Sequence, residues 1–224
     1  MRNLIRQLQA YWLADASFVT LLLMLITAVF ILPVLMEVSS HGLHLFNILL
    51  LSVFFSGIFS TRRMGLIAVS AILFGVHLTL RLIRFGDNPY SFYVVENVIG
   101  VANILVFIFI NYRLLFRDEV VNANRIIGAV NIYLLLALMG ALTFEIIHVT
   151  TGTSLGGNVV LNGSDSDYVH FIYFSLSSLT TVGFGDIYAV NTSARMLATF
   201  LSTLGILFPA VVIARLVGLA SKQS

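Results

Sequence analysis

The residues whose types and spacing could do chemistry form one run, Thr180-Thr181-Val182-Gly183-Phe184-Gly185-Asp186. Glycine adopts backbone dihedrals that other residues avoid, so glycines at alternate positions allow successive carbonyl oxygens to point toward one axis. Val182 and Phe184 can then direct their side chains away from that axis, and the Thr181 hydroxyl can add a further oxygen ligand. Carbonyl oxygens in such a row can replace the hydration shell of a cation. The run therefore predicts a loop that coordinates ions.

A short helix is predicted immediately before this loop. Residues 168–185 carry no Asp, Glu, Lys or Arg, but they are rich in Ser and Thr and end in Gly-x-Gly, so they would form a poor membrane-spanning helix. Non-helical backbone is tolerated at membrane depth only where it is buried in protein or lines water. We therefore interpret the stretch as a re-entrant helix over residues 168–179 followed by the loop. Asp165, Ser166 and Asp167 are suited to cap its start, and the negative end of its dipole favours a cation at the loop.

In this context, the Thr-x-Gly-x-Gly-Asp pattern resembles the filter of the tetrameric potassium channels, in particular those with four spans before a two-span pore module. The resemblance extends over residues 126–218, as outer helix, external turret, pore helix, filter and inner helix. It implies a homotetramer, because each chain supplies one of four filter strands. It also implies that permeant K⁺ binds to oxygens of the filter residues Thr181, Val182, Gly183 and Phe184, followed by Gly185.

The same resemblance assigns residues that support the filter. Thr180 and Asp186 flank it. Ser177 stands where some relatives have an acidic pore-helix residue, so a carboxyl–carboxylate pair with Asp186 is not expected. Glu145 stands where relatives often have an acid that braces the loop after the filter.

Two residues of the inner helix are predicted to take part in gating. Gly205 lies at the distance from the filter at which relatives have a hinge glycine. An ordinary close contact between helices is the alternative, since small residues are common at such contacts in membranes. Pro209, one turn later, should kink the helix because proline lacks a backbone donor.

The composition indicates an integral membrane protein. Of the 224 residues, 59% are hydrophobic and only 10% are charged, against about 25% charged residues in soluble domains. These fractions exclude intrinsic disorder, and the net charge of +2 gives no indication of nucleic-acid binding. The absence of cysteine excludes disulfides and thiolate metal sites. No residue set indicates an enzyme or a bound cofactor other than the permeant K⁺.

Six stretches are long and apolar enough to cross a membrane as helices, which takes about 20 residues each. They are residues 16–36, 38–61, 64–80, 92–112, 126–144 and 196–214. If both termini are cytoplasmic, nine of the twelve basic residues lie inside, as the positive-inside rule requires. The predicted inside set is Arg2, Arg6, Arg62, Arg63, Arg113, Arg117, Arg125, Arg215 and Lys222. We therefore predict an all-α membrane protein with six spans, one re-entrant pore helix and one filter loop per subunit.

The sequence divides into three predicted parts. They are a cytoplasmic interfacial segment (1–15), a four-helix transmembrane domain (16–118), and a linker with a two-helix pore domain and a short cytoplasmic tail (119–224). The four-helix domain resembles a voltage-sensor domain without gating charges, because its fourth span has no basic residue before Arg113. Several charges would be needed for steep voltage gating.

Three charged residues lie near the outer end of this domain. Arg81 and Arg84 have the spacing of gating charges but lie at the end of the third span. Glu96 lies within the fourth span, where an ionisable residue is a functional candidate by default. We favour a structural ion pair between Glu96 and one of these arginines.

The predicted function is passive K⁺ conduction without strong voltage dependence, in the plasma membrane or in the inner membrane of a bacterium. The alternatives are a weakly selective monovalent cation channel and a regulatory subunit that does not conduct alone. A secondary transporter is disfavoured, because such proteins normally show paired broken helices and only one re-entrant element is predicted here. The expected partners are further copies of the chain and membrane lipids. The sequence indicates no gating stimulus and no regulatory partner.

Overall fold

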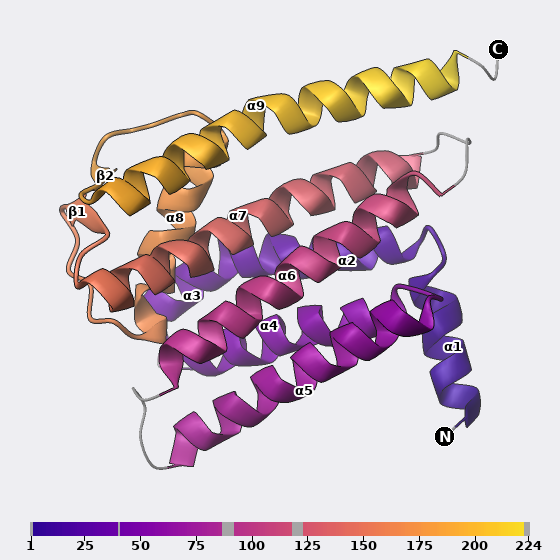
Figure 1. Cartoon of the computed structure of the whole chain (residues 1–224), viewed down its shortest axis with the longest axis horizontal. Helices are drawn as coiled ribbons and strands as arrows, with labels where there is room; N and C mark the ends of the chain where they lie inside the picture. The colour runs from indigo at the N-terminus through magenta and orange to yellow at the C-terminus, as the bar shows by residue number, and fades with distance from the viewer. Residues whose placement is uncertain (1, 40, 87–91, 118–122, 222–224) are drawn as a thin grey trace.

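The computed structural model describes residues 2–39, 41–86, 92–117 and 123–221. In this part of the chain, six helices are long and apolar enough to cross a membrane. They lie side by side in one bundle, with both chain termini at one end and the β1–β2 sheet at the other (Figure 1). We refer to these as the terminal end and the sheet end.

The four-helix part begins with α1 (Arg2–Trp12), which projects from the bundle (Figure 1). The first span consists of α2 (Ser17–Ile26), a π-helical turn (Thr27–Ile31) and α3 (Leu32–Val38). The next three are α4 (Gly42–Phe59), α5 (Met64–Gly86) and α6 (Tyr93–Leu115).

The pore part has two long helices, α7 (Ala123–Thr151) and α9 (Thr192–Ala220). Between them come strand β1 (Leu155–Gly157), a 3₁₀ turn (Asp165–Asp167), the short helix α8 (Tyr168–Leu179) and strand β2 (Ile187–Ala189). The expected helix at 168–179 is therefore present at its predicted bounds.

Each predicted span coincides with one of the six long helices, but several extend beyond their predicted ends. The third span was expected to stop at residue 80, whereas α5 continues through Arg81 and Arg84. It can do so because both guanidinium groups pair with carboxylates. The predicted boundary at 118/119 and the predicted inside residue Lys222 lie outside the described residues.

A proline inside the first span explains its π-helical turn. Pro33 has no N–H to donate to the carbonyl of Val29, four residues earlier. The turn just before it is wider, and the N–H of Leu32 bonds to the carbonyl of Thr27, five residues back. The extra residue in this turn lets the helix continue past the proline without a break.

Helix α7 is the centre of the bundle. It packs against α2 and α6 of the four-helix part and against α8 and α9 of the pore part. In its most apolar window 67% of the residues are buried, against 11% for α9. Since α9 is at least as apolar as α7, most of its surface must be covered by lipid or by other protein chains.

Candidate functional site

The loop after α8 has alternating left-handed backbone conformations. The φ angles are 60° at Thr181, 58° at Gly183 and 82° at Gly185. The sequence predicted this alternation for the two glycines. It did not predict it for Thr181, which in the described part of the chain is the only residue other than glycine with a positive φ.

Backbone hydrogen bonds tie the start of this loop to the end of α8. The N–H groups of Val182 and Gly183 both donate to the carbonyl of Ser177, at 3.1 and 3.3 Å, and the N–H of Thr181 donates to Ser178 at 3.1 Å. In a trans peptide the N–H and C=O point in opposite directions. These bonds therefore turn the carbonyls of residues 180, 181 and 182 away from α8, where they are free to act as ligands.

The pore helix α8 is fixed to its neighbours near the same carboxyl end. The Ser175 hydroxyl donates to the carbonyl of Ala137 on α7 at 2.7 Å, and Tyr133 of α7 donates to the carbonyl of Leu179 at 3.1 Å. On α9, the Ser202 hydroxyl donates to the carbonyl of Ser178 at 2.8 Å. The bonds to Ser178 and Leu179 reach carbonyls at the end of α8, where intrahelical partners are lacking, and the three bonds together position the loop relative to both long helices.

Asp186 has a partner that sequence reasoning missed. The Tyr173 hydroxyl donates to its carboxylate at 2.8 Å, and this hydrogen bond raises the pKa of Tyr173. The Tyr173 ring also lies nearly parallel to that of Phe184, with centroids 6.1 Å apart. Tyr173 lies one helical turn before Ser177 on α8. A tyrosine at this position was the sequence feature that could have indicated a hydrogen-bond donor for Asp186.

The chain after the loop is braced by a small sheet. Strands β1 and β2 pair antiparallel, with Gly157 opposite Ile187. Gly157 has φ 117°, and a Cβ there would lie 2.1 Å from the carbonyl oxygen of Asp186, so no side chain fits. Asn191 adds a second tie, because its amide donates to the Thr151 hydroxyl at 2.9 Å and to the carbonyl of Thr153.

Glu145 does not brace this loop as expected. Its buried carboxylate accepts a hydrogen bond from Tyr93, on α6. Glu145 lies on the part of α7 that packs toward the four-helix part, and the β1–β2 sheet and Asn191 brace the loop instead. The prediction placed the acid on the correct helix but assigned it the wrong partner.

The predicted caps of the pore helix also have different roles. The Asp167 carboxylate accepts bonds from the N–H groups of Asn162 and Gly163, both at 2.7 Å, and forms a capping box with Ser164 around the 3₁₀ turn. No side chain caps α8 itself.

Asp165 instead joins a buried group of charges between the two parts of the chain. Its carboxylate pairs with Arg81 at 3.1 Å and with Arg84 at 2.9 Å. Arg81 and Arg84 also pair with Glu96, each at 2.8 Å. The predicted ion pair of Glu96 is therefore present, and it includes both arginines. We call these four residues the outer charge cluster; Tyr93 links it to Glu145, since its hydroxyl also donates to Asp165 at 3.2 Å.

Gly205 lies where α9 approaches α8 most closely. A Cβ at this position would lie 1.6 Å from the carbonyl oxygen of Leu179. Helix α9 continues unbroken through Gly205 and Pro209. Pro209 has no N–H to donate to the Gly205 carbonyl, four residues earlier, so the helix lacks one hydrogen bond at this point. The close contact explains the glycine without a hinge, and the hinge stays a prediction.

Comparison with known proteins bears on the pore part. Residues 126–222 match the model of a protein family described as ion channel. The match supports an ion channel. It begins within α7 and includes α8, the alternating loop, both strands and α9, but not α5 and α6, which carry Arg81, Arg84, Tyr93 and Glu96. It suggests a transporter-type protein rather than an enzyme and, with the six apolar helices, supports an integral membrane protein. Searches of curated proteins and of solved structures found no match.

Removal of the Tyr173 hydroxyl should weaken the hydrogen bonding that supports the loop after α8. We expect Tyr173→Phe to lose current several-fold faster during sustained opening at low K⁺, because the Asp186 carboxylate loses its donor. Planar-bilayer recording measures the decay. Tyr188→Phe makes the same chemical change on β2, where the exposed ring has no hydroxyl bond among the described residues. Equal decay rates in both variants would contradict the role of the Tyr173–Asp186 bond.

Substitution of Gly205 by alanine tests whether this glycine is required for close packing of α9 against α8 or serves as a hinge. We expect Gly205→Ala to lower stability by roughly 1–3 kcal/mol or more, because the methyl group overlaps a backbone oxygen. Thermal unfolding of the purified protein measures the loss. Gly218→Ala on the same helix is the control, since its Cβ would meet nothing within 4 Å. If Gly205→Ala kept normal stability and only reduced opening, the hinge interpretation would be favoured.

Proposed function

We propose that the chain forms a potassium-selective channel, in which four copies surround one axis and K⁺ passes passively through their filter loops. The observation that carries this proposal is the loop geometry. Left-handed residues alternate at 181, 183 and 185, and hydrogen bonds to α8 turn three successive carbonyls away from the helix. Such a row of oxygens can replace the hydration shell of K⁺. The ligands would be the oxygens of residues 181–184, with Gly185 completing the filter.

Exposure in the single chain supports assembly with further copies. Val182 is 54% exposed and Phe184 is 69% exposed, although both are apolar. The residues on either side of them are exposed as well, so one chain leaves its filter uncovered. Neighbouring copies around an axis would cover these side chains and complete the coordination of each ion.

Weak voltage dependence is part of the proposal. Moving one elementary charge through 100 mV supplies about 2.3 kcal/mol, so steep gating needs several mobile charges. Helix α6 has one arginine, Arg113, near its end. Arg81 and Arg84 are held by Glu96 and Asp165. We therefore interpret Arg81 and Arg84 as charges that stabilise the fold and do not move with voltage.

Reconstitution of the purified chain in planar bilayers tests the proposal. With K⁺ on one side and Na⁺ on the other, we expect single-channel currents whose reversal potential lies far toward that of K⁺. A 100 mV step should change the ratio of open to closed channels by less than about 50-fold, the effect of one charge. A reversal potential near zero would favour a weakly selective cation channel. Silence of the chain alone, with altered currents of a partner channel, would favour a regulatory subunit.

A further inference from the structure

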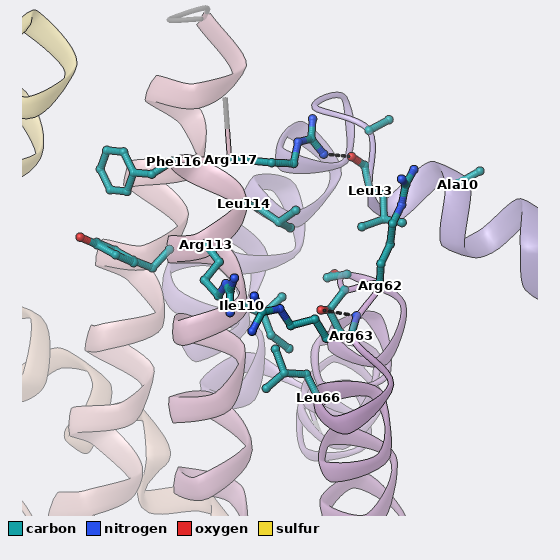
Figure 2. A pocket seen from close by; sticks show the side chains of 14 residues that line it. Ala10, Leu13, Arg62, Arg63, Leu66, Ile110, Arg113, Leu114, Phe116 and Arg117 are labelled. Atoms are coloured by element: carbon teal, nitrogen blue, oxygen red, sulfur yellow. Dashed lines mark hydrogen bonds between the residues drawn. The ribbon is translucent and has the colours of Figure 1, made fainter. Parts of the chain in front are cut away.

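A cavity of about 850 Å³ lies at the terminal end of the bundle, far from the filter loop (Figures 1 and 2). Three segments form its walls. They are the turn after α1 at Leu13, the connection between α4 and α5 at Arg62 and Arg63, and the end of α6 at Arg113. Phe116 and Arg117, which directly follow α6, also line it.

The charged side chains that line this cavity in the described part of the chain are all positive. They are Arg62, Arg63, Arg113 and Arg117, and no acidic residue among the described ones lines it. Arg117 donates to the carbonyl of Leu13 at 2.8 Å and pairs with Asp15. The ion pairs among the described residues do not include Arg62, Arg63 or Arg113. Figure 2 shows the side chains of Arg63 and Arg113 pointing toward one another across the cavity. Like charges that face each other repel, so this arrangement favours an anion between them.

The rest of the lining indicates an anion with an apolar body. Leu66, Ile110 and Leu114 lie beside the arginines. The two arginines at 62 and 63 immediately precede the first residue of a membrane-spanning helix, Met64, so they lie at the level where lipid headgroups are found. The guanidinium group of arginine matches the geometry of phosphate and can bind it through two parallel hydrogen bonds.

We propose that this cavity binds the phosphate-bearing headgroup of an anionic membrane lipid. Arg62, Arg63 and Arg113 bind the headgroup, and Leu66 and Leu114 contact the start of the acyl chains. The cavity also includes Phe116 and Arg117, where the chain leaves α6 toward α7. A bound lipid therefore contacts the connection between the four-helix part and the pore part. Placing this lipid in the cytoplasmic leaflet rests on the orientation predicted from the basic residues; the binding itself does not depend on ion conduction.

The chain contains one natural reporter near this site. Trp12 is its only tryptophan and directly precedes Leu13, which lines the cavity. The indole itself lies in a neighbouring pocket with Met24 and Phe74. We would reconstitute the full chain in phosphatidylcholine vesicles and replace part of the lipid with brominated phosphatidylcholine or brominated phosphatidylglycerol. Bromine quenches indole fluorescence at short range. The ratio of the two quenching curves gives the relative affinity of the site for the anionic lipid.

In the unchanged protein, we expect brominated phosphatidylglycerol to quench Trp12 more strongly than brominated phosphatidylcholine. Each arginine near an anionic membrane surface contributes a factor of about five in binding. Arg62→Gln with Arg113→Gln should therefore reduce the preference by roughly an order of magnitude or more. Both side chains are exposed, so the substitutions leave the packed core intact. Arg195→Gln is the control, because this exposed arginine lies at the sheet end.

Two outcomes would overturn the proposal. The first is a preference for the anionic lipid that is the same in the Arg62→Gln, Arg113→Gln protein as in the unchanged protein. The second is reversal of the quenching by millimolar inorganic phosphate, which would mean that the cavity binds soluble anions. Because fluorescence is measured without current, a protein that fails to conduct K⁺ can still pass this test, and a conducting protein can fail it.

Discussion

Replacement of Gly183 by alanine should abolish selective K⁺ current. Gly183 has φ 58°, and residues with a Cβ pay about 1–2 kcal/mol for the left-handed conformation. In a tetramer this conformational cost would arise four times, once in each chain, at the same level of the ion path. Relief of the strain requires rotation of the peptide units on either side, which would turn carbonyl oxygens away from the ion. We therefore expect loss of conduction, or loss of discrimination between K⁺ and Na⁺, rather than a small change in conductance.

The control for this experiment is Gly75→Ala. Gly75 lies within α5, and a Cβ there meets no atom within 4 Å, as is also true of Gly183 in the single chain. The two substitutions therefore differ in backbone conformation and not in available space. Bi-ionic reversal potentials in planar bilayers measure the result. Currents of normal selectivity from Gly183→Ala would refute the assignment of the loop as the filter.

The part of the site that the sequence predicted is the part determined by local chemistry. Alternating glycines require no distant partner to adopt left-handed dihedrals, so the loop conformation at Gly183 and Gly185 could be predicted from seven residues. Thr181 shows the limit of this reasoning, since no rule assigns a positive φ to threonine. It adopts one because its own N–H and those of the next two residues are bonded to α8. Those bonds depend on how the loop folds back, which the run of residues does not encode by itself.

The sequence could not predict which side chains far apart along the chain bind one another. Asp165 was expected to cap the helix that begins three residues later, but its carboxylate binds Arg81, which is 84 residues distant in sequence. Glu145 was expected to brace the loop after the filter, but it binds Tyr93 on the four-helix part. In both cases the sequence singled out the residue but assigned it a different partner. Its partner depends on which helices become neighbours, and this follows from packing around α7 and not from spacing along the chain.

Removal of one charge from the outer charge cluster is expected to cause the largest loss of stability. We expect Glu96→Gln to destabilise the protein by about 3–5 kcal/mol, the typical cost of removing one partner of a buried ion pair. The side chain of Glu96 is 1% exposed and that of Arg81 is 3% exposed, so water cannot replace the lost carboxylate. Two arginines would then share the single charge of Asp165. Because Asp165 directly precedes the pore helix, we also expect a lower fraction of assembled, conducting channels.

The control for Glu96→Gln is Glu37→Gln, which makes the same change at the end of α3, where the described residues provide no ion pair. Thermal unfolding of both variants should show a large loss for the first and little for the second. Combining Glu96→Gln with Arg84→Gln restores the balance of charge in the cluster. Since both residues belong to one network, the double variant should lose less stability than the sum of the two single variants. Simple additivity, or normal stability of Glu96→Gln, would show that the cluster does not join the four-helix part to the pore.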